Sequence, residues 1–127
     1  MNTKSLTIFV IGMIFWLIFM TSVSQAQAPT RTLTEKEQLV LFTHNEAKKY
    51  NIDPIKLQKT IECESGYNKS AAGDGGKSRG VAQIHKRWHP NVSDKQAFDP
   101  YWSVTWAAKR FADGYAKEWT CYRELFM

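Results

Sequence analysis

Residues 53–84 read DPIKLQKTIECESGYNKSAAGDGGKSRGVAQI, a run that contains a helix signal and then a glycine-rich segment. Asp53 followed by Pro54 is typical of a helix start, because aspartate caps the first backbone N–H groups and proline is tolerated in the first turn. Gly66 predicts the helix end, since glycine readily adopts the left-handed conformation that follows many helices. We therefore expect a helix between Asp53 and Gly66, followed by a glycine-rich loop over residues 72–80.

Within this expected helix, Glu64 occupies a different face from its near neighbour Glu62. Leu57, Thr60 and Ile61 precede Glu64 at helical spacing, which places all four residues on one mostly apolar face. Burial there would disfavour the charged carboxylate and raise its pKa, which suits a general acid. The pattern also fits a glutamate whose carboxylate reaches water because the helix is ending, so both interpretations stay open from the spacing alone.

Capping patterns predict further helices before and after this stretch. TEKE at residues 34–37 is a capping box for a helix that runs to about Tyr50, and SDKQ at residues 93–96 is another for a short helix. Asp-Pro at residues 99–100 opens a longer helix that closes near Gly114. Alternating Val, Ile and Thr are almost absent, so we expect a small, mainly α domain with little or no sheet.

The chain has 127 residues, with 17 Lys and Arg against 12 Asp and Glu, and a formal net charge of +5. This length allows one domain and excludes two-domain enzymes and polytopic transporters. Lysine and arginine are scattered without a run or a nucleic-acid motif, so the positive charge favours anionic cell-wall polymers as partners over nucleic acid. We expect no nucleic-acid partner and a monomeric protein.

The densest hydrophobic block lies near the N-terminus, at residues 6–20. Lys4 precedes it and small residues around Ala26 follow it, which is the pattern of a secretory signal peptide. An uncleaved membrane anchor is the alternative, because the extended run is close to the shortest length that spans a bilayer. Either interpretation predicts export, with the domain periplasmic, extracellular or anchored to the membrane facing outward. The expected divisions are a signal peptide or anchor (1–26), a short lead-in (27–33) and the folded domain (34–127).

Two cysteines, Cys63 and Cys121, lie in the expected domain. In an oxidising compartment two cysteines suggest one disulfide, and a bridge across a loop of this length would stabilise the fold by about 4 kcal/mol. Two buried free thiols are the alternative.

ESGYN at residues 64–68, followed by GDGGKSRGVAQI at residues 73–84, resembles the lytic transglycosylase domain of the goose-lysozyme-like superfamily. In that family an E-S pair, a short loop and an S-x-G-L-x-Q-I segment follow one another. The likeness runs from about residue 47 to residue 114 and includes the Asp-Pro pair before the later helix. It implies a lysozyme-like fold.

The same resemblance implies roles for four residues. Glu64 would be the catalytic acid/base, Ser65 would support the site, and Ser78 and Gln83 would contact the peptidoglycan strand. The reaction implied is cleavage of the β-1,4 bond between N-acetylmuramic acid and N-acetylglucosamine. In these enzymes one glutamate protonates the leaving oxygen and then deprotonates the 6-hydroxyl, which closes a 1,6-anhydro ring while the N-acetyl group stabilises the sugar cation.

The C-terminal segment departs from the family pattern. Family members carry a later Y-N-A-G segment whose tyrosine faces the catalytic glutamate, whereas this chain ends in WTCYRELFM at residues 119–127. Tyr122 is the candidate for that role, because a bridge between Cys63 and Cys121 would hold the tail beside Glu64.

Two other functions remain open from the sequence. If Asp74 positioned a water, the enzyme would be a hydrolytic muramidase, although an aspartate before glycine is more typical of a turn. Without a complete catalytic set, the domain would be a non-catalytic peptidoglycan-binding module. AAGDGGKS at residues 71–78 is close to a phosphate-binding loop, but no buried strand precedes it, so we reject a nucleotide site.

No cofactor and no metal are expected. His85 and His89 lie four apart, but Lys86 follows the first of them where a zinc protease has glutamate. Trp88 and Trp119 lie in less regular segments and are the candidates for stacking on sugar rings. Trp102 and Trp106 lie four residues apart in the expected later helix, and this helical spacing predicts core positions for both.

Overall fold

Helix α2 (Glu35–Lys49) and helix α3 (Pro54–Ser65) begin where their caps predict in the computed structural model, which describes residues 30–127. The Thr34 side chain and the third helical residue form the predicted capping box at the start of α2. The Asp53 carboxylate accepts a backbone N–H at the start of α3, and Gly66 ends that helix in the left-handed conformation, at φ 61°. Local hydrogen bonding therefore sets both boundaries.

Helix α4 (Asp94–Phe98) and helix α5 (Pro100–Ala112) are also capped as predicted. Ser93 supplies the capping box of α4, and the Asp99 carboxylate accepts two backbone N–H groups at the start of α5. The longer helix closes just before Gly114, whose φ of 88° turns the chain away.

The C-terminal segment forms a short 3-10 helix, η2 (Ala116–Glu118), and a final helix, α6 (Thr120–Phe126), which the sequence did not predict. The N-cap residue of α6 is Trp119, and no side-chain hydrogen bond caps the helix. Because a capping pattern is the local signal of a helix start, α6 lacks the feature that identified the other helices.

The glycine-rich segment is a small antiparallel sheet of three two-residue strands. Strands β1 (Ala72–Gly73), β2 (Ser78–Arg79) and β3 (Ile84–His85) lie in the order β1-β2-β3, and the 3-10 turn η1 (Asp74–Gly76) joins the first two. Two-residue strands are too short to show alternation, which explains why this segment reads as a loop. The domain is mainly helical with a small sheet, as expected.

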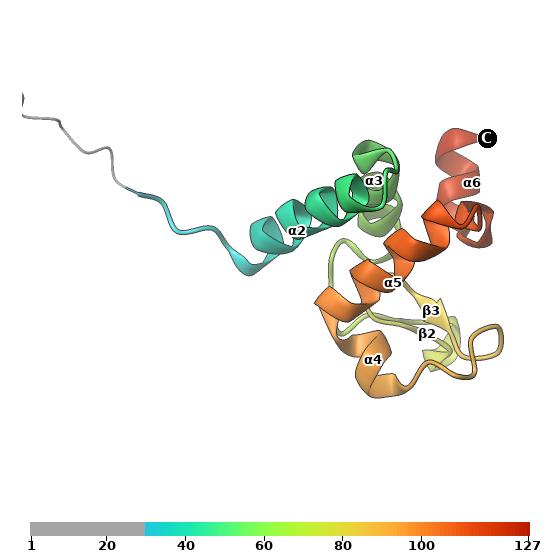
Figure 1. Cartoon of the computed structure of the whole chain (residues 1–127). Coiled ribbons are helices and arrows are strands. Elements are labelled where there is room, and N and C mark those ends of the chain that lie inside the picture. Colours follow the sequence, from blue (N-terminus) through green and yellow to red (C-terminus); the bar gives the residue numbers. More distant parts are fainter. Residues whose placement is uncertain (1–29) are drawn as a thin grey trace, which may run out of the picture. The chain divides into compact units, whose positions relative to one another are not determined.

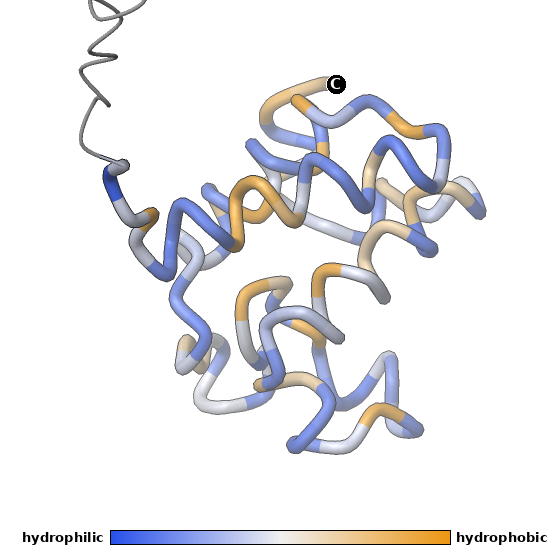
Figure 2. Tube along the Cα trace, turned by 60° about the vertical axis from the view of Figure 1, so that its left-hand side comes forward, coloured by the Kyte–Doolittle hydropathy of each residue, from blue (hydrophilic) through white to orange (hydrophobic). Residues whose placement is uncertain are grey.

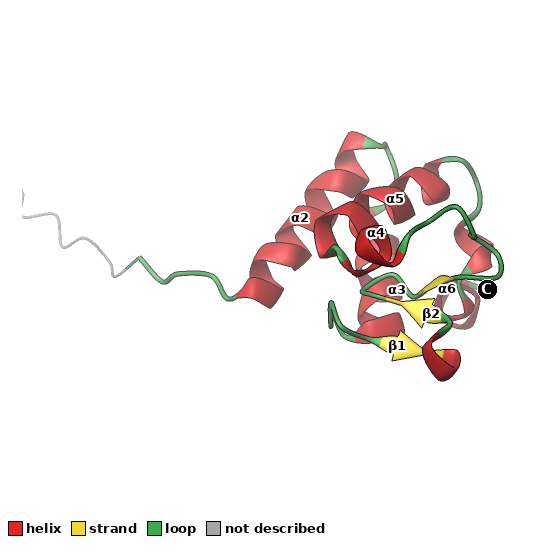
Figure 3. Ribbon diagram, turned by 90° about the horizontal axis from the view of Figure 1, so that it is seen from below, coloured by secondary structure: helices red, strands yellow, loops and turns green. Residues whose placement is uncertain are grey.

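The helices enclose one core. Helix α2 contacts α3 and α5, and helix α6 contacts α3. Strand β2 contacts helix α4, and both lie below α5 in the view of Figure 1 and near one another in Figure 3. Figure 2 shows hydrophobic residues recurring along the helices between hydrophilic ones. The largest apolar side chains of this core are Leu39, Leu57, Ile61, Val81, Ile84, Val104, Phe111 and Trp119.

Arg79 holds the sheet against the segment that leads into α4. Its side chain is only 2% exposed. It donates to the carbonyls of Ile84 at 3.1 Å and Val92 at 2.9 Å, and to the Asp94 carboxylate at 2.9 Å. A buried guanidinium needs such partners, because an unpaired buried charge is costly. These bonds fix the loop over residues 80–83, which leads to the candidate site.

Residues 33–127 form one compact unit. The predicted signal peptide or anchor (1–26) and residues 27–29 of the predicted lead-in (27–33) lie outside the described residues. Within the described part of the chain, every helix is too short or too polar to cross a membrane.

Candidate functional site

Glu64 lies in the last turn of α3, on the face that its spacing predicts. Leu57, Thr60 and Ile61 on that face are buried, whereas Glu62 is exposed and forms an ion pair with a lysine of α2. Glu64 itself is half-buried. The tertiary structure therefore gives the two carboxylates the different surroundings that the helical pattern predicts.

The carboxyl group of Glu64 is oriented by α6. The backbone N–H of Cys121 donates to its Oε1 atom at 3.1 Å, across a separation of 57 residues. Among residues 30–127, no hydrogen bond occupies its Oε2 atom. The backbone of α6 thus orients one of the two carboxyl oxygens.

Burial raises the pKa of the Glu64 carboxyl above its ordinary value, because desolvation disfavours the carboxylate. The hydrogen bond from Cys121 opposes this pKa shift. The negative charges of Glu124 and Asp74 add to the rise, and the positive charge of Arg123 reduces it. The net direction is upward, as a general acid requires.

The predicted disulfide is present. Cys63 and Cys121 are joined at 2.04 Å between their sulfur atoms, which rules out two free thiols. The bridge connects α3 at the residue before Glu64 with α6 at the residue whose N–H contacts Glu64. The disulfide and the hydrogen bond from Cys121 therefore both join α6 to α3 beside the Glu64 carboxyl group.

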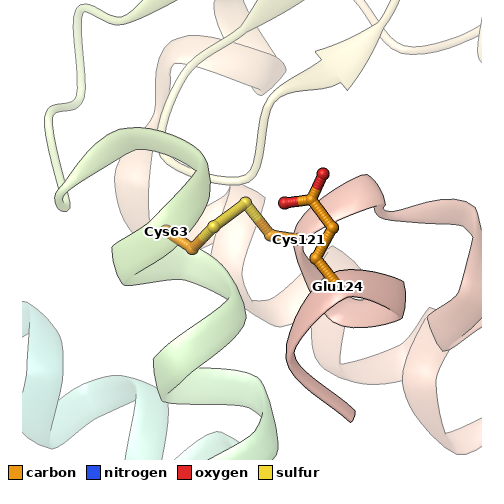
Figure 4. Close-up of side chains that lie close together, drawn as sticks. All are labelled: Cys63, Cys121 and Glu124. Carbon is orange, nitrogen blue, oxygen red and sulfur yellow. A yellow bond between two sulfur atoms is a disulfide. The ribbon is translucent and has the colours of Figure 1, made fainter. Parts of the chain in front are cut away.

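A carboxylate that the sequence did not single out lies beside this bridge. An oxygen of Glu124 and the sulfurs of Cys63 and Cys121 lie within 4.8 Å of one another. Figure 4 shows the three side chains, with Cys63 on α3 and the other two on α6. This is the one cluster of metal-ligating residue types in residues 30–127. Because the sulfurs are joined in a disulfide, they offer no thiolates to a metal ion. Glu124 acts on this site through its charge.

Ser65 and Gln83 link the end of α3 to the loop that follows β2. The Ser65 hydroxyl donates to the Val81 carbonyl at 2.7 Å. Gln83 has a φ of 50°, a strained value for a residue with a side chain, and its amide donates to the Gly80 carbonyl at 2.9 Å. Strain of this kind persists where the surrounding structure imposes it, often at functional sites. Ser65 thus holds the loop through one hydrogen bond, while its role in a catalytic site stays a prediction.

Ser78 lies within the hairpin. Its side chain is 5% exposed, and its hydroxyl donates to the Asp74 carboxylate. Asp74 has a φ of 51° and begins the turn η1, which is the turn-forming role expected of an aspartate before glycine. Ser78 therefore has a structural role in the hairpin, and its contact with a glycan stays a prediction.

A pocket of about 560 Å³ opens next to Gln83. It is bounded by Gln83, Ile84, His85, Trp88, His89, Trp106, Arg110, Glu118 and Trp119. Glu64 is not one of its walls. Gln83 and Trp119 nevertheless connect the two regions, because Gln83 follows the loop that Ser65 holds and Trp119 leads into α6.

The tryptophans of this pocket differ from their predicted roles in two cases. Trp88 is 67% exposed, as a stacking residue must be. Trp119, also predicted to stack, is only 7% exposed, because its ring nitrogen donates to the Ala82 carbonyl at 2.7 Å and anchors the start of α6. Trp106, predicted in the core, is half-buried and forms part of the pocket wall. Helical spacing predicted that Trp106 faces inward, but it did not predict the pocket that Trp106 lines.

Charged residues on α5 and η2 form a further wall that the sequence did not indicate. Arg110 pairs with Glu118, and the imidazole of His89 lies 3.5 Å from the same carboxylate and edge-on to Trp106. Burial lowers the pKa of His89, and the neighbouring Glu118 carboxylate opposes that shift. These residues come from three segments that are separate in the sequence, the loop after β3, α5 and η2, and the fold brings them together.

Tyr122 lies on α6 and is half-buried. Its ring packs edge-on against Phe111, with 5.4 Å between ring centres, and lies tilted against Phe126 at 5.3 Å. The contact that α6 makes with Glu64 comes from the backbone of Cys121. The predicted role of Tyr122 toward Glu64 therefore stays a prediction.

These positions bring Glu64, Ser65 and Gln83 to one region, where α3, the loop after β2 and the start of α6 meet. No protein family model, curated protein or solved structure matches the chain. The candidate site is accordingly defined by its residues and their geometry.

Proposed function

We propose that this protein is a lytic transglycosylase, which cleaves the β-1,4 bond between N-acetylmuramic acid and N-acetylglucosamine in peptidoglycan. The observation that carries this proposal is the carboxyl group of Glu64. It is half-buried at a helix end, burial raises its pKa, and one of its oxygens is oriented by a backbone N–H. The resemblance of the surrounding motifs adds a lysozyme-like fold and the identity of the glycan.

Glu64 performs both proton transfers of this reaction. Its protonated oxygen donates to the glycosidic oxygen as the bond to the leaving sugar breaks. The substrate's own N-acetyl group stabilises the resulting cation. The carboxylate then takes the proton of the 6-hydroxyl, and that oxygen closes the 1,6-anhydro ring. The group ends protonated, as it began, and no water is consumed.

The surroundings of Asp74 favour this single-carboxylate route over hydrolysis. Most glycosidases use two carboxyl groups, one of which activates water or attacks the sugar. The Asp74 carboxylate instead accepts the Ser78 hydroxyl within the hairpin. The carboxylate of Glu124 lies against the disulfide. Asp74 thus has a structural partner and Glu124 is exposed, whereas Glu64 combines partial burial with a backbone hydrogen bond, so we assign Glu64 as the acid/base.

The pocket beside Gln83 would hold a neighbouring part of the glycan strand. Its aromatic walls offer apolar faces for sugar rings, and its charged wall offers hydrogen-bond partners. The net charge of +5 would attract anionic cell-wall polymers. The disulfide fits an oxidising compartment, in agreement with the proposed export of the domain.

Digestion of purified peptidoglycan, followed by mass spectrometry of the products, tests this function. Anhydro-muropeptides are expected. Products with ordinary reducing ends would show hydrolysis and identify a muramidase. Binding to peptidoglycan without any cleavage would show a non-catalytic module and contradict both enzymatic assignments.

The rate of cleavage should fall as pH rises through the pKa of Glu64. The acid form is the active one, and burial raises this pKa, so activity should persist to a higher pH than an exposed glutamate would allow. In Glu124→Gln a nearby negative charge is lost, so the alkaline limb of the pH–rate profile should move to lower pH. Initial rates of glycan cleavage across the pH range measure both effects. An unmoved limb in this variant would contradict the assigned influence of Glu124.

Trp88→Ala should weaken binding to glycan strands by about 0.5–1.5 kcal/mol without unfolding the domain, because an exposed aromatic face is lost. The side chain is 67% exposed, so its removal leaves no cavity. Sedimentation with insoluble peptidoglycan measures the affinity. Tyr101→Ala is the matched control, since Tyr101 is an exposed aromatic residue outside the pocket. Equal losses in the two variants would contradict a stacking role for Trp88.

A further inference from the structure

The two chain segments that form the environment of Glu64 are joined covalently at that point. Cys63 precedes Glu64 on α3, and Cys121 supplies the N–H that contacts Glu64 Oε1 at 3.1 Å. The disulfide therefore ties the helix that bears the acid to the residue that orients it. A bridge elsewhere between these helices would stabilise the fold without acting on the carboxyl group.

Helix α6 has few other means of holding its position. It has seven residues and no side-chain cap. A helix this short is unstable without tertiary contacts. Those contacts include the ring of Tyr122 against Phe111 and the hydrogen bond from Trp119 to Ala82 at its start, which join α6 to α5 and to the loop. Helix α6 also meets α3, through the hydrogen bond from Cys121 to Glu64 and the Lys56 ammonium 5.8 Å from the Phe126 ring centre. The disulfide is the covalent tie between the two helices.

We propose that the Cys63–Cys121 disulfide is a positioning device for Glu64, so that the active site is assembled in the oxidised chain and comes apart on reduction. This inference rests on the proposed function, because it concerns the activity of the same carboxyl group. Reduction frees α6 to move away from α3. Glu64 then loses both the N–H that orients it and part of its burial.

The structure indicates how a dithiol reductant would open the bridge. Cys63 is exposed and Cys121 is buried. A thiolate of the reductant attacks the Cys63 sulfur, the disulfide bond breaks, and Cys121 leaves as a thiolate that takes a proton. The second thiol of the reductant then displaces Cys63, so two electrons and two protons pass to the protein as the reductant becomes a disulfide.

The test compares peptidoglycan cleavage by the full chain in its oxidised state, after reduction with dithiothreitol, and after reoxidation. Reduction should lower the rate by about 100-fold, since small displacements of a catalytic group have effects of this size. Reoxidation should restore the rate. The double variant Cys63→Ser, Cys121→Ser should show the low rate under both conditions. An unchanged rate in the reduced chain would overturn the proposal.

Phe126→Ala is the matched control, because it loosens the far end of α6 while keeping the disulfide. Its rate should stay within about twofold of the unmodified chain, as expected for a residue outside the site. Far-ultraviolet circular dichroism follows the helices α2, α3 and α5 throughout. If the reduced chain loses this helical signal, the bridge is a staple of the fold and the positioning proposal is overturned. Where the double variant does not fold, the reduced and reoxidised native chain decides the matter.

The pH profile separates positioning from general stabilisation. Burial is the largest cause of the raised pKa of Glu64, and it outweighs the hydrogen bond from Cys121. Release of α6 should therefore lower this pKa, and the alkaline limb of the residual activity should move to lower pH. An unmoved limb would overturn the proposal. If the oxidised chain does not cleave peptidoglycan at all, the proposed function itself fails, which is a distinguishable result.

Discussion

Glu64→Gln should abolish peptidoglycan cleavage, with a fall in rate of about 10,000-fold, the upper range for loss of a general acid. The amide matches the carboxyl group in shape and still offers an oxygen to the Cys121 N–H, so the local geometry is preserved. It has no acidic proton to give to the leaving oxygen, and it does not take a proton from the 6-hydroxyl. Both halves of the proposed reaction therefore fail together.

The folded state should tolerate this change. Glu64 is half-buried, and burial disfavours its charged form, so a neutral amide relieves part of that cost. Assay by release of soluble muropeptides, together with thermal unfolding, separates activity from stability. Activity equal to that of the unmodified protein in the Gln variant would refute the assignment of Glu64.

Glu62→Gln is the matched control for this experiment. It makes the same chemical change two residues away on the same helix, where the side chain is exposed and pairs with Lys36 at 2.9 Å. An exposed ion pair of this kind contributes little, about 0–1 kcal/mol. Cleavage should be retained in this variant. A comparable loss in both variants would point to the net charge of the surface and not to the chemistry of Glu64.

Gly80→Ala should lower the free energy of unfolding by about 3–5 kcal/mol, among the largest effects of a single substitution. Gly80 has a φ of 70°, which strains any residue with a side chain. The added Cβ would also lie 1.9 Å from the backbone oxygen of Ala97 on α4. The loop has little freedom to retreat, because Arg79 ties it to Val92 and Asp94. Urea unfolding followed by circular dichroism measures the loss.

Gly75→Ala separates the two causes. Gly75 has a similar φ of 65°, but no atom lies within 4 Å of an added Cβ. The variant should therefore show the conformational cost alone, about 1–2 kcal/mol. Equal losses in the two glycine variants would contradict the close approach to α4 as the cause. The comparison also explains why a glycine follows Arg79 in the S-R-G-V-A-Q-I segment.

The helices that the sequence predicted correctly have local start signals. Their caps depend on hydrogen bonds between residues two or three apart, so the local sequence is enough to identify these helix starts. The capping residues are Thr34, Asp53, Ser93 and Asp99. Helix α6 has no such cap. Its position depends on contacts with α3 and α5, which the local sequence does not encode in a recognisable pattern.

The pocket likewise combines features that the local sequence predicts with features that depend on tertiary contacts. The inward direction of Trp106 follows from helical spacing, but its place on a wall with His89 and Arg110 depends on how α5 meets the loop after β3. The burial of Trp119 depends on a hydrogen bond to Ala82, 37 residues away. The residue type of Trp119 suggested stacking on a sugar, but its hydrogen bond to the Ala82 carbonyl holds the ring in a buried position.

The sequence by itself determined the helical character of the domain, the face on which Glu64 lies, and the pair of cysteines available for a bridge. Each follows from short-range rules of helix periodicity, capping and cysteine count. Only the tertiary structure decided that the backbone N–H of Cys121 meets Glu64 across 57 residues, and that Glu124 lies beside the disulfide. The reason is physical: the orientation and pKa of a carboxyl group depend on the atoms around it in space, and these come from segments that fold together only when the core forms.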